Sequence, residues 1–412
     1  MKKSARAAGF SALLFAACIC GGCGKDASAV VTTENTLLMA ETEDERESWT
    51  ETGGDERTDD SAADVGEGSG DVNDAETAGV ALAETGDTEN ETKETDNIVT
   101  ITISAAGDVT LGNYLGQDYT RSFVQTYEEQ GNAYFFQNVL EYFLDDDMTI
   151  VNFEGVLTES EEIQEKDFNM KGEPEYVYIL TEGSVEAVSF GNNHRLDYLT
   201  QGSRDTVDMF EEADIAYAYD NITGIYETKG IRIGFVSVNE ASQGVAVEKY
   251  LKEGIAKLRD EEEADLVIAC CHWGIEGDNY PEDYQKELGH KCIDWGADLV
   301  LGAHPHVLQG IEVYEGKFIV YSLGNFCFGA NRNPSDKDTM IFRQTFTFVD
   351  GVKKEDREVR VIPCSISSVP ERNDFCPTPA QDEEYTRILG RINQYSEPFD
   401  VIFDEKGWYR KD

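Results

Sequence analysis

The sequence is poor in positive charge. Its 412 residues include 34 lysines and arginines against 82 aspartates and glutamates, so the formal net charge is −48 at pH 7. Nucleic acids and anionic bilayer surfaces attract proteins mainly through clustered lysine and arginine side chains. The composition therefore argues against both as electrostatic partners, and we expect no nucleic-acid ligand. A cationic partner stays open.

The cysteines lack the spacing of a zinc-folded or disulfide-stapled domain. Those that follow residue 23 are Cys270, Cys271, Cys292, Cys327, Cys364 and Cys376. They include no C-x-x-C pair and no dense framework, so neither a structural zinc site nor a small disulfide scaffold is indicated. Cys270 and Cys271 sit in an apolar run and are expected to be small core residues. One disulfide between Cys364 and Cys376 stays open.

The apolar run near the N-terminus, which ends at Cys20, is too short for a comfortable membrane span. It follows a basic start, as in a secretion signal. Small residues before Cys23 resemble a bacterial lipoprotein signal in which Cys23 becomes the lipidated N-terminus. Cys18 is the alternative acceptor, and a plain cleaved signal is the other interpretation. We favour a lipoprotein-type signal peptide over 1–23, and hence an extracytoplasmic bacterial protein that a lipid anchors to the cell membrane.

Residues 24–97 have few basic and few aromatic side chains. They hold 23 acidic against 4 basic residues, with abundant threonine, serine, glycine and alanine. Such a segment cannot bury enough apolar surface to offset its chain entropy, and its like charges repel and extend it. We expect residues 24–97 to be a disordered acidic tether. Because it would repel an acidic polymer, we interpret it as a spacer.

From Ile98 onward the composition is that of a globular protein, in which strand and helix patterns alternate. Apolar runs predict strands over 98–104, 148–153, 230–238, 264–271, 298–302, 310–314, 317–321, 339–348 and 358–366. Helical spacing predicts helices over 133–144, 202–213, 247–259, 284–295 and 381–395. This alternation predicts an α/β fold of layered mixed sheets flanked by helices. We place the main domain at 98–370 and a C-terminal extension with a helix at 371–412.

Four of the five histidines follow apolar, strand-like runs: His194, His272, His304 and His306. His304 and His306 flank a proline, which disfavours helix, and residues two apart in an extended segment project to one face. Imidazole is a preferred ligand of divalent metals. A lone histidine after a strand is more often structural, so the His-Pro-His pair is the sharpest local indication of a metal site.

Asp108, Glu154 and Asn193 also lie at the ends of hydrophobic runs. Asp108 has an alternative interpretation as a turn former after Gly107. Glu154 near a core is costly unless a cation or hydrogen bonds compensate its charge. Asn193 offers an amide ligand beside a potential general acid, His194, although this pair could instead cap a following helix. The joint set of imidazole, carboxylate and amide groups predicts a metal centre at a sheet edge.

The order of these motifs resembles the CapA family, the poly-γ-glutamate capsule biosynthesis proteins. The matching segments span about residues 100–330 and are Gly107-Asp108, Asn152 to Glu154, Asn192 to Tyr198, His272 to Gly274, Gly302 to Gly310, and Ser322 to Phe326. That family is similar to the calcineurin-like metallophosphoesterases. The resemblance implies a calcineurin-like metallophosphatase fold, a four-layer αββα sandwich with two mixed sheets, and a dinuclear metal site at the strand ends.

The resemblance also implies roles for individual residues. Two sets of metal ligands share Glu154 as the bridge: Asp108, Glu154 and His306 for the first ion, and Glu154, Asn193, His272 and His304 for the second. His194 lies outside the coordination shell and protonates a leaving group or orients the substrate. The two divalent ions are expected to be manganese, iron or zinc.

The sequence departs from the phosphoesterase pattern at Thr110, where a histidine is usual, so the first ion loses an imidazole.

The expected function is synthesis, export or anchoring of poly-γ-glutamate or another capsule polymer, with an anionic surface polymer or its synthesis machinery as partner. Such a centre would support hydrolysis or acyl transfer. Two alternatives stay open: a phosphoesterase acting on nucleotides or cell-wall phosphates, and a non-catalytic capsule-assembly subunit.

Overall fold

Strands that are apolar throughout serve two hydrophobic cores at once. In β10 (Leu266–His272), Leu266, Ile268 and Cys270 point into one core, and the residues between them point into another. Successive residues of a strand face opposite sides of a sheet, so such a strand must be covered on both faces.

The computed structural model describes residues 97–355 and 358–410, which belong to one compact unit.

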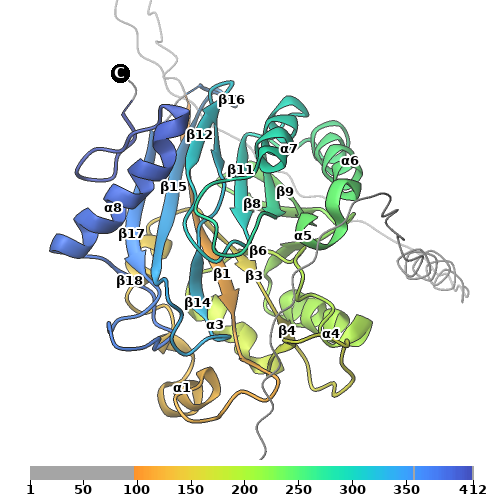
Figure 1. The fold of residues 1–412 in the computed structure, drawn as a ribbon. Helices are drawn as coiled ribbons and strands as arrows, with labels where there is room; N and C mark the ends of the chain where they lie inside the picture. Colours follow the sequence, from red (N-terminus) through yellow and green to blue (C-terminus); the bar gives the residue numbers. More distant parts are fainter. Residues whose placement is uncertain (1–96, 356–357, 411–412) are drawn as a thin grey trace, which may run out of the picture. The chain divides into compact units, whose positions relative to one another are not determined.

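The larger sheet has nine strands (Figure 1). They are β1 (Ile98–Thr110), β3 (Met148–Phe153), β6 (Ala187–Ser189), β7 (Ala216–Ala218), β14 (Asn325–Phe328), β15 (Asp338–Val349), β16 (Val352–Lys353), β17 (Glu358–Ser365) and β18 (Thr378–Pro379). Their order is β18-β17-β15-β1-β3-β6-β7, with β14 beside β1 and β16 beside β15. The β1-β3-β6-β7 part is parallel, and the β1-β15-β17-β18 part is antiparallel.

A second sheet has six strands and a third has three. The six are β8 (Gly224–Thr228), β9 (Ile231–Asn239), β10, β11 (Leu299–Ala303), β12 (Ile311–Tyr314) and β13 (Lys317–Val320). In the order β12-β13-β11-β10-β9-β8, the four inner strands are parallel and both edge strands are antiparallel. The small sheet joins β2 (Asn113–Tyr114), β5 (Met170–Gly172) and β4 (Val156–Leu157).

Helices cover the outer face of each of the two large sheets (Figure 1). The α-helices are α1 (Phe123–Gln130), α2 (Leu140–Leu144), α3 (Val177–Glu182), α4 (Leu199–Glu212), α5 (Glu240–Gln243), α6 (Val247–Asp260), α7 (Asp283–Asp294) and α8 (Asp382–Ser396). The short 3-10 turns are η1 (Asn132–Tyr134), η2 (Pro174–Tyr176), η3 (Gly244–Ala246) and η4 (Glu397–Phe399).

Three hydrophobic cores define the layers. One lies between the two large sheets, one joins the nine-stranded sheet to α1, α2, α3 and α4, and one joins the six-stranded sheet to α6 and α7. Each fully buried side chain such as Leu251 of α6 contributes about 1.5–3 kcal/mol. This arrangement confirms the predicted α/β class with two mixed sheets in an αββα order.

The C-terminal helix α8 completes the core between the sheets. Its residues Ile388, Leu389 and Ile392 are buried there beside Val359 and Val361 of β17. The helix predicted over 381–395 is therefore confirmed, and the segment that carries it packs into the same core as the strands before it.

The predicted helix over 133–144 is wrong for most of its length. The structure has η1, a series of turns, and then the short α2. Tertiary contacts decide the local conformation here: the Gln137 and Asn138 amides donate to the Cys376 thiol, and Phe135 stacks on Phe123 with ring centroids 4.4 Å apart. Such contacts override helix propensity, which is a weak preference.

Strand β1 is longer than predicted and continues past Gly107 to Thr110. Asp108 is thus a strand residue, and its interpretation as a turn former is wrong. Gly107 is required because the residue before β14 comes very close: a Cβ atom at this position would lie 1.8 Å from the Gly324 carbonyl oxygen. The pairing of β1 with β3 is irregular between Ala106 and Asp108, which re-aims the Asp108 side chain.

The predicted signal peptide, its Cys23 and Cys18 lipidation candidates, and the tether over 24–97 lie outside the described residues, apart from Asn97. Within the part of the chain that the structure covers, no helix combines the length and apolar character that a membrane crossing requires. Cys364 and Cys376 are free buried thiols, so the disulfide left open between them is absent. Cys270 and Cys271 are buried core residues, as predicted.

Asp146, in the turn between α2 and β3, makes stability depend on pH. Burial raises the pKa of its carboxyl from 3.8 to about 7, against the effect of the hydrogen bond from Thr149. A carboxyl with a raised folded-state pKa favours folding while it is protonated, so its contribution is lost as pH rises from about 4 to about 7. We predict that Asp146→Asn, which removes this titration, gains stability relative to wild type over that range.

The measurement is urea unfolding of both proteins at pH 4.5, 6 and 8. Subtracting the two free energies of unfolding removes the contributions of all other carboxyls. A difference that stays constant from pH 4.5 to 8 would show that burial of Asp146 does not perturb its ionisation.

Candidate metal centre

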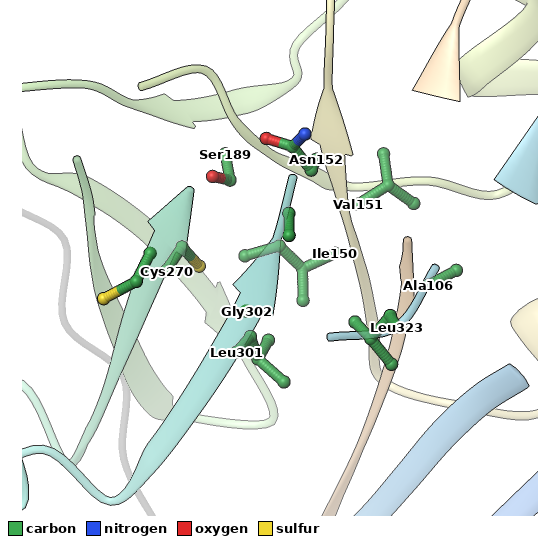
Figure 2. A pocket seen from close by; sticks show the side chains of 11 residues that line it. Ala106, Ile150, Val151, Asn152, Ser189, Cys270, Leu301, Gly302 and Leu323 are labelled. Carbon is green, nitrogen blue, oxygen red and sulfur yellow. The ribbon is translucent and has the colours of Figure 1, made fainter. Parts of the chain in front are cut away.

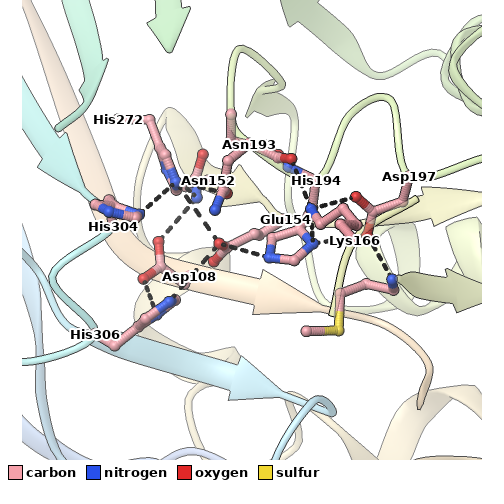
Figure 3. A network of polar contacts seen from close by, with 12 residues as sticks. Asp108, Asn152, Glu154, Lys166, Asn193, His194, Asp197, His272, His304 and His306 are labelled. Atoms are coloured by element: carbon pink, nitrogen blue, oxygen red, sulfur yellow. Dashed lines mark hydrogen bonds and ion pairs between the residues drawn. The ribbon is translucent and has the colours of Figure 1, made fainter. Parts of the chain in front are cut away.

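The predicted site residues come together at the carboxyl ends of the parallel strands. Asp108 lies near the end of β1, Glu154 follows β3, and Asn193 follows β6. His272 is the last residue of β10, and His304 follows β11. Ligand sites of open α/β sheets form at this end of the strands. Because two stacked sheets present their carboxyl ends together, residues up to about 200 positions apart in sequence face one another (Figure 3).

Glu154 is a buried carboxylate without a hydrogen-bond donor. Its exposed fraction is 1%, and neither carboxylate oxygen has a hydrogen-bond partner among the described residues. Three imidazole nitrogens surround its Oε1: Nε2 of His272 at 3.7 Å, and Nε2 of His194 and of His306 at 3.8 Å each. Burial raises the pKa of this carboxyl. A charge in such a place is stable only with a compensating cation.

His272 is the hub of one group of donor atoms. Its Nε2 lies 3.0 Å from Asn193 Oδ1 and 3.0 Å from His304 Nδ1, and the side chain is fully buried. Burial lowers the pKa of His272 well below its usual value, and burial together with the nearby His306 lowers that of His304 to about 4. Both imidazoles are therefore neutral near pH 7, which is the form that binds metals.

His306 is the hub of a second group. Its Nδ1 lies 3.0 Å from Asp108 Oδ2, while its Nε2 faces Glu154. Burial by itself would lower the pKa of His306, but the Glu154 and Asp108 carboxylates outweigh burial and raise it. The environment of His306 thus favours positive charge, which a proton or a metal ion can supply.

The segment that carries His304 and His306 has an unusual backbone. The φ angles are +95° at His304 and +58° at His306, where residues other than glycine are uncommon. The carbonyl of Pro305 between them accepts a hydrogen bond of 2.8 Å from the Gly277 amide. Strained backbone of this kind costs about 1–3 kcal/mol per residue and clusters at functional sites.

His194 is held by a different buried carboxylate, Asp197. His194 Nδ1 lies 2.7 Å from Asp197 Oδ2, and Lys166 Nζ lies 2.7 Å from Asp197 Oδ1. The Met170 amide also donates to Asp197. Since an ionised carboxylate only accepts, the His194 proton sits on Nδ1, and Nε2 faces the centre toward Glu154. The helix-cap interpretation of Asn193 and His194 is wrong, because α4 starts at Leu199 without a side-chain cap.

Two buried carboxylates that lie 2.7 Å and 3.8 Å from nitrogens of the same imidazole therefore differ in kind. Asp197 accepts from three protein donors, one of them the Lys166 cation. Glu154 accepts from none of the described residues. This contrast indicates that Asp197 orients His194, whereas Glu154 is arranged to bind a cation.

The donor set fits a divalent metal ion. The donor atoms of Glu154, His304 and His306 all lie within 4.8 Å of one another, so side chains of both groups converge on the same place. The surrounding atoms are carboxylate and amide oxygens and imidazole nitrogens, which suit manganese, iron or zinc. The unpartnered, buried Glu154 oxygens are the observation that makes the fit specific to a cation.

Sequence reasoning gave no role to three residues that support the centre. Asn152 Nδ2 donates to Asp108 Oδ1 at 2.8 Å and lies 3.4 Å from His272 Nδ1, so one amide touches both groups of donor atoms. Asp197 follows His194 by three residues, and this spacing was the available signal. Lys166 comes from a loop after β4, where nothing in the sequence pointed to the site.

A small cavity lies between the two sheets below the site (Figure 2). Its volume of about 20 Å³ is on the scale of one water molecule. Asn152, Ser189 and Cys270 are among its lining residues, and the Asn152 Oδ1 atom is buried without a hydrogen-bond partner in the described structure. The cavity is too small for a substrate, so a substrate must approach from the solvent side of the centre.

Comparison with known proteins identifies the family. Residues 102–330 match the family described as bacterial capsule synthesis protein PGA_cap. The chain belongs to this family. The match covers every residue predicted for the metal site, from Asp108 to His306, and confirms the resemblance inferred from the motifs.

Two curated relatives carry related names. The chain is 32% identical over 254 residues to the capsule biosynthesis protein CapA of Bacillus anthracis. It is 31% identical over 249 residues to the PGA biosynthesis protein CapA of Bacillus subtilis strain 168. Each alignment covers 55% of this chain, and they cover 60% and 63% of the two relatives. The chain thus matches about three fifths of the length of these family members.

We predict that removing the negative charge has a large effect on stability at Asp197 and a small one at Glu154. Asp197→Asn should cost about 3 kcal/mol or more of stability, because the amide keeps one acceptor oxygen for three donors and carries no charge to compensate the Lys166 cation. Glu154→Gln should change stability in the presence of a chelator by less than about 1 kcal/mol, since its oxygens have no protein donors to lose. Added Mn²⁺ should stabilise wild type and Asp197→Asn but not Glu154→Gln.

Urea unfolding with EDTA and with Mn²⁺ measures both effects. If Mn²⁺ stabilised Glu154→Gln as much as wild type, Glu154 would not be a metal ligand. Equal destabilisation of both variants in EDTA would contradict the contrast between the two carboxylates.

Proposed function

We propose that this protein is an extracytoplasmic, membrane-tethered member of the family that acts in synthesis, export or anchoring of a capsule polymer such as poly-γ-glutamate, through a dinuclear metal site. The observation that carries the proposal is the Glu154 carboxylate, which is buried, has no protein donor in the described structure, and lies at the centre of three imidazoles.

The proposed ligands divide according to the two hubs. Asp108 and His306 would hold the first ion, Asn193, His272 and His304 would hold the second, and Glu154 would contribute to both. The 3.0 Å separations between donor atoms within each group support this division. Manganese, iron and zinc all accept such mixed nitrogen and oxygen ligands.

Divalent ions at such a centre supply Lewis acidity and a nucleophile at neutral pH, which suits hydrolysis or acyl transfer. The chain's own residues supply orientation and proton transfer. Asp197 and Lys166 hold His194 so that its Nε2 faces the centre, where the doubly protonated ring, with Nδ1–H on Asp197, can deliver its Nε2 proton to a leaving group. Because Asp197 fixes the ring, His194 is positioned before the substrate arrives.

The names of the two relatives support a polymer-related process. One is a capsule biosynthesis protein and the other a PGA biosynthesis protein. We propose an anionic surface polymer, or the machinery that makes it, as the partner. The net charge of −48 would repel a polyanion, so the cationic centre is the place where its carboxylates can bind.

Metal analysis and substrate screening test the proposal. Purified full-length protein should contain two equivalents of transition metal by mass spectrometry, and His304→Ala and Glu154→Ala should each lose metal. Metal-loaded wild type should cleave or transfer γ-glutamyl peptides, and both variants should lose more than about 100-fold in rate. His290→Ala, which alters a histidine bonded to Glu312 away from the centre, is the control with normal metal content.

The outcomes separate the candidate functions. Cleavage of phosphodiesters without action on γ-glutamyl peptides would favour the phosphoesterase function. Bound metal without activity on either class would favour a non-catalytic assembly subunit. Unchanged metal content in both variants would overturn the site itself.

Membrane anchoring is tested separately through the lipidation site. We propose Cys23 as the acceptor, so Cys23→Ala should move most of the protein from the membrane fraction to the soluble extracytoplasmic fraction, because its hydrocarbon anchor is lost. Cys18→Ala serves as the control and should stay on the membrane. Retention of Cys23→Ala with release of Cys18→Ala would move the anchor to Cys18, and retention of both would contradict lipid anchoring.

A further inference from the structure

Asn325 lies directly beside the first group of donor atoms. It is the first residue of β14 and pairs with Asp108 of β1 in the parallel register. Its exposed fraction is 3%. A buried amide with two donors and two acceptor sites needs hydrogen-bond partners or other ligands. Its contacts therefore show how the amide is oriented and what it can bind.

The orientation of the Asn325 amide follows from its contacts. Nδ2 donates to the main-chain carbonyl of His306 at 3.1 Å. Because a carbonyl oxygen can only accept, the amide NH₂ group must face it, and the amide oxygen must point the other way. Oδ1 then lies 3.0 Å from His306 Nδ1, the same nitrogen that lies 3.0 Å from Asp108 Oδ2.

The same geometry recurs at the other hub. There, His272 Nε2 lies 3.0 Å from the Asn193 amide oxygen and 3.0 Å from a nitrogen of His304. Two ligands at right angles, each about 2.1 Å from one ion, lie about 3.0 Å apart. Asn325 is thus placed relative to His306 as Asn193 is placed relative to His272.

The first group of donor atoms is smaller than the second. Thr110 stands where the phosphoesterase pattern has a histidine, and its buried hydroxyl has no hydrogen-bond partner in the described structure. Asp108 and His306 therefore contribute fewer donor atoms than the second group does. Asn325 is the additional oxygen beside both of them.

We propose that Asn325 Oδ1 is a ligand of the first metal ion and replaces the imidazole that Thr110 cannot supply. This inference rests on the proposed dinuclear site. An amide oxygen is a harder donor than imidazole, so the exchange shifts the first site toward Mn²⁺ and away from Zn²⁺.

The competing role for Asn325 is purely one of positioning. Its bond to the His306 carbonyl holds a residue whose φ angle is +58°, and this bond alone could support the centre. Asn325→Asp separates the two roles. An ionised aspartate keeps an oxygen for the metal but cannot donate to the His306 carbonyl, whereas Asn325→Ala removes both contacts.

The experiment titrates the metal-free full-length chain with Mn²⁺ and follows it by calorimetry and electron paramagnetic resonance. Wild type should bind two ions, and the second to enter should convert an isolated Mn²⁺ signal into a spin-coupled one. Asn325→Ala should weaken one site by about 100-fold or more and keep the isolated signal at ion ratios where wild type is coupled. Asn325→Asp should retain two sites with affinity equal to or above that of wild type.

Two further variants serve as controls for the titration. Ser322→Ala removes a buried hydroxyl that bonds the Val307 carbonyl in the same segment and should leave both sites unchanged. Asn193→Ala should weaken the other site, so that Asn193→Ala combined with Asn325→Ala loses both. Circular dichroism of each variant verifies that it is folded.

Each outcome bears on one claim. If Asn325→Asp were weakened as much as Asn325→Ala, Asn325 would be a positioning residue and not a ligand. Two unchanged sites in folded Asn325→Ala would also overturn the inference. A wild-type protein that binds fewer than two Mn²⁺ ions would instead overturn the dinuclear site on which the inference depends.

Discussion

The burial of the Glu154 charge is the constraint on which the centre depends. An ionised carboxylate taken out of water costs several kcal/mol unless cations or donors compensate it. Asp197, on the other side of the His194 ring, accepts hydrogen bonds from three protein donors. Glu154 accepts none from the described residues. The surroundings of Glu154 therefore favour a cation, and the imidazoles around it are the further donors of the proposed metal site.

The fold supplies the stability that offsets the buried charge. Two sheets packed over one hydrophobic core bring the carboxyl ends of β1, β3, β6, β10 and β11 to a common edge, and outer helices cover both remaining faces. The strands are rigid, so ligand positions vary little, and the less regular segment around Pro305 adds two strained histidines. Stability is supplied by the cores, and the cost of strain and buried charge is concentrated at the site.

Sequence reasoning succeeded where the signal was local and repeated. Apolar runs located β10, β15 and β17, and the polar residues that follow apolar runs located the donor atoms at strand ends. It failed for residues 133–144, where apolar residues at helical spacing are recruited by tertiary contacts into turns. It also missed the short strand β7, because three residues are too few to show a period.

The sequence by itself determined the layered α/β class, the family and the chemical types of the ligands, because each of these is encoded in contiguous stretches of residues. Only the tertiary structure decided which carboxylate is satisfied and which is left for a cation. It alone placed Lys166 on Asp197 and Asn325 beside Asp108. These contacts join segments 31 and 217 residues apart. Their energies depend on distance and burial, which no local pattern records.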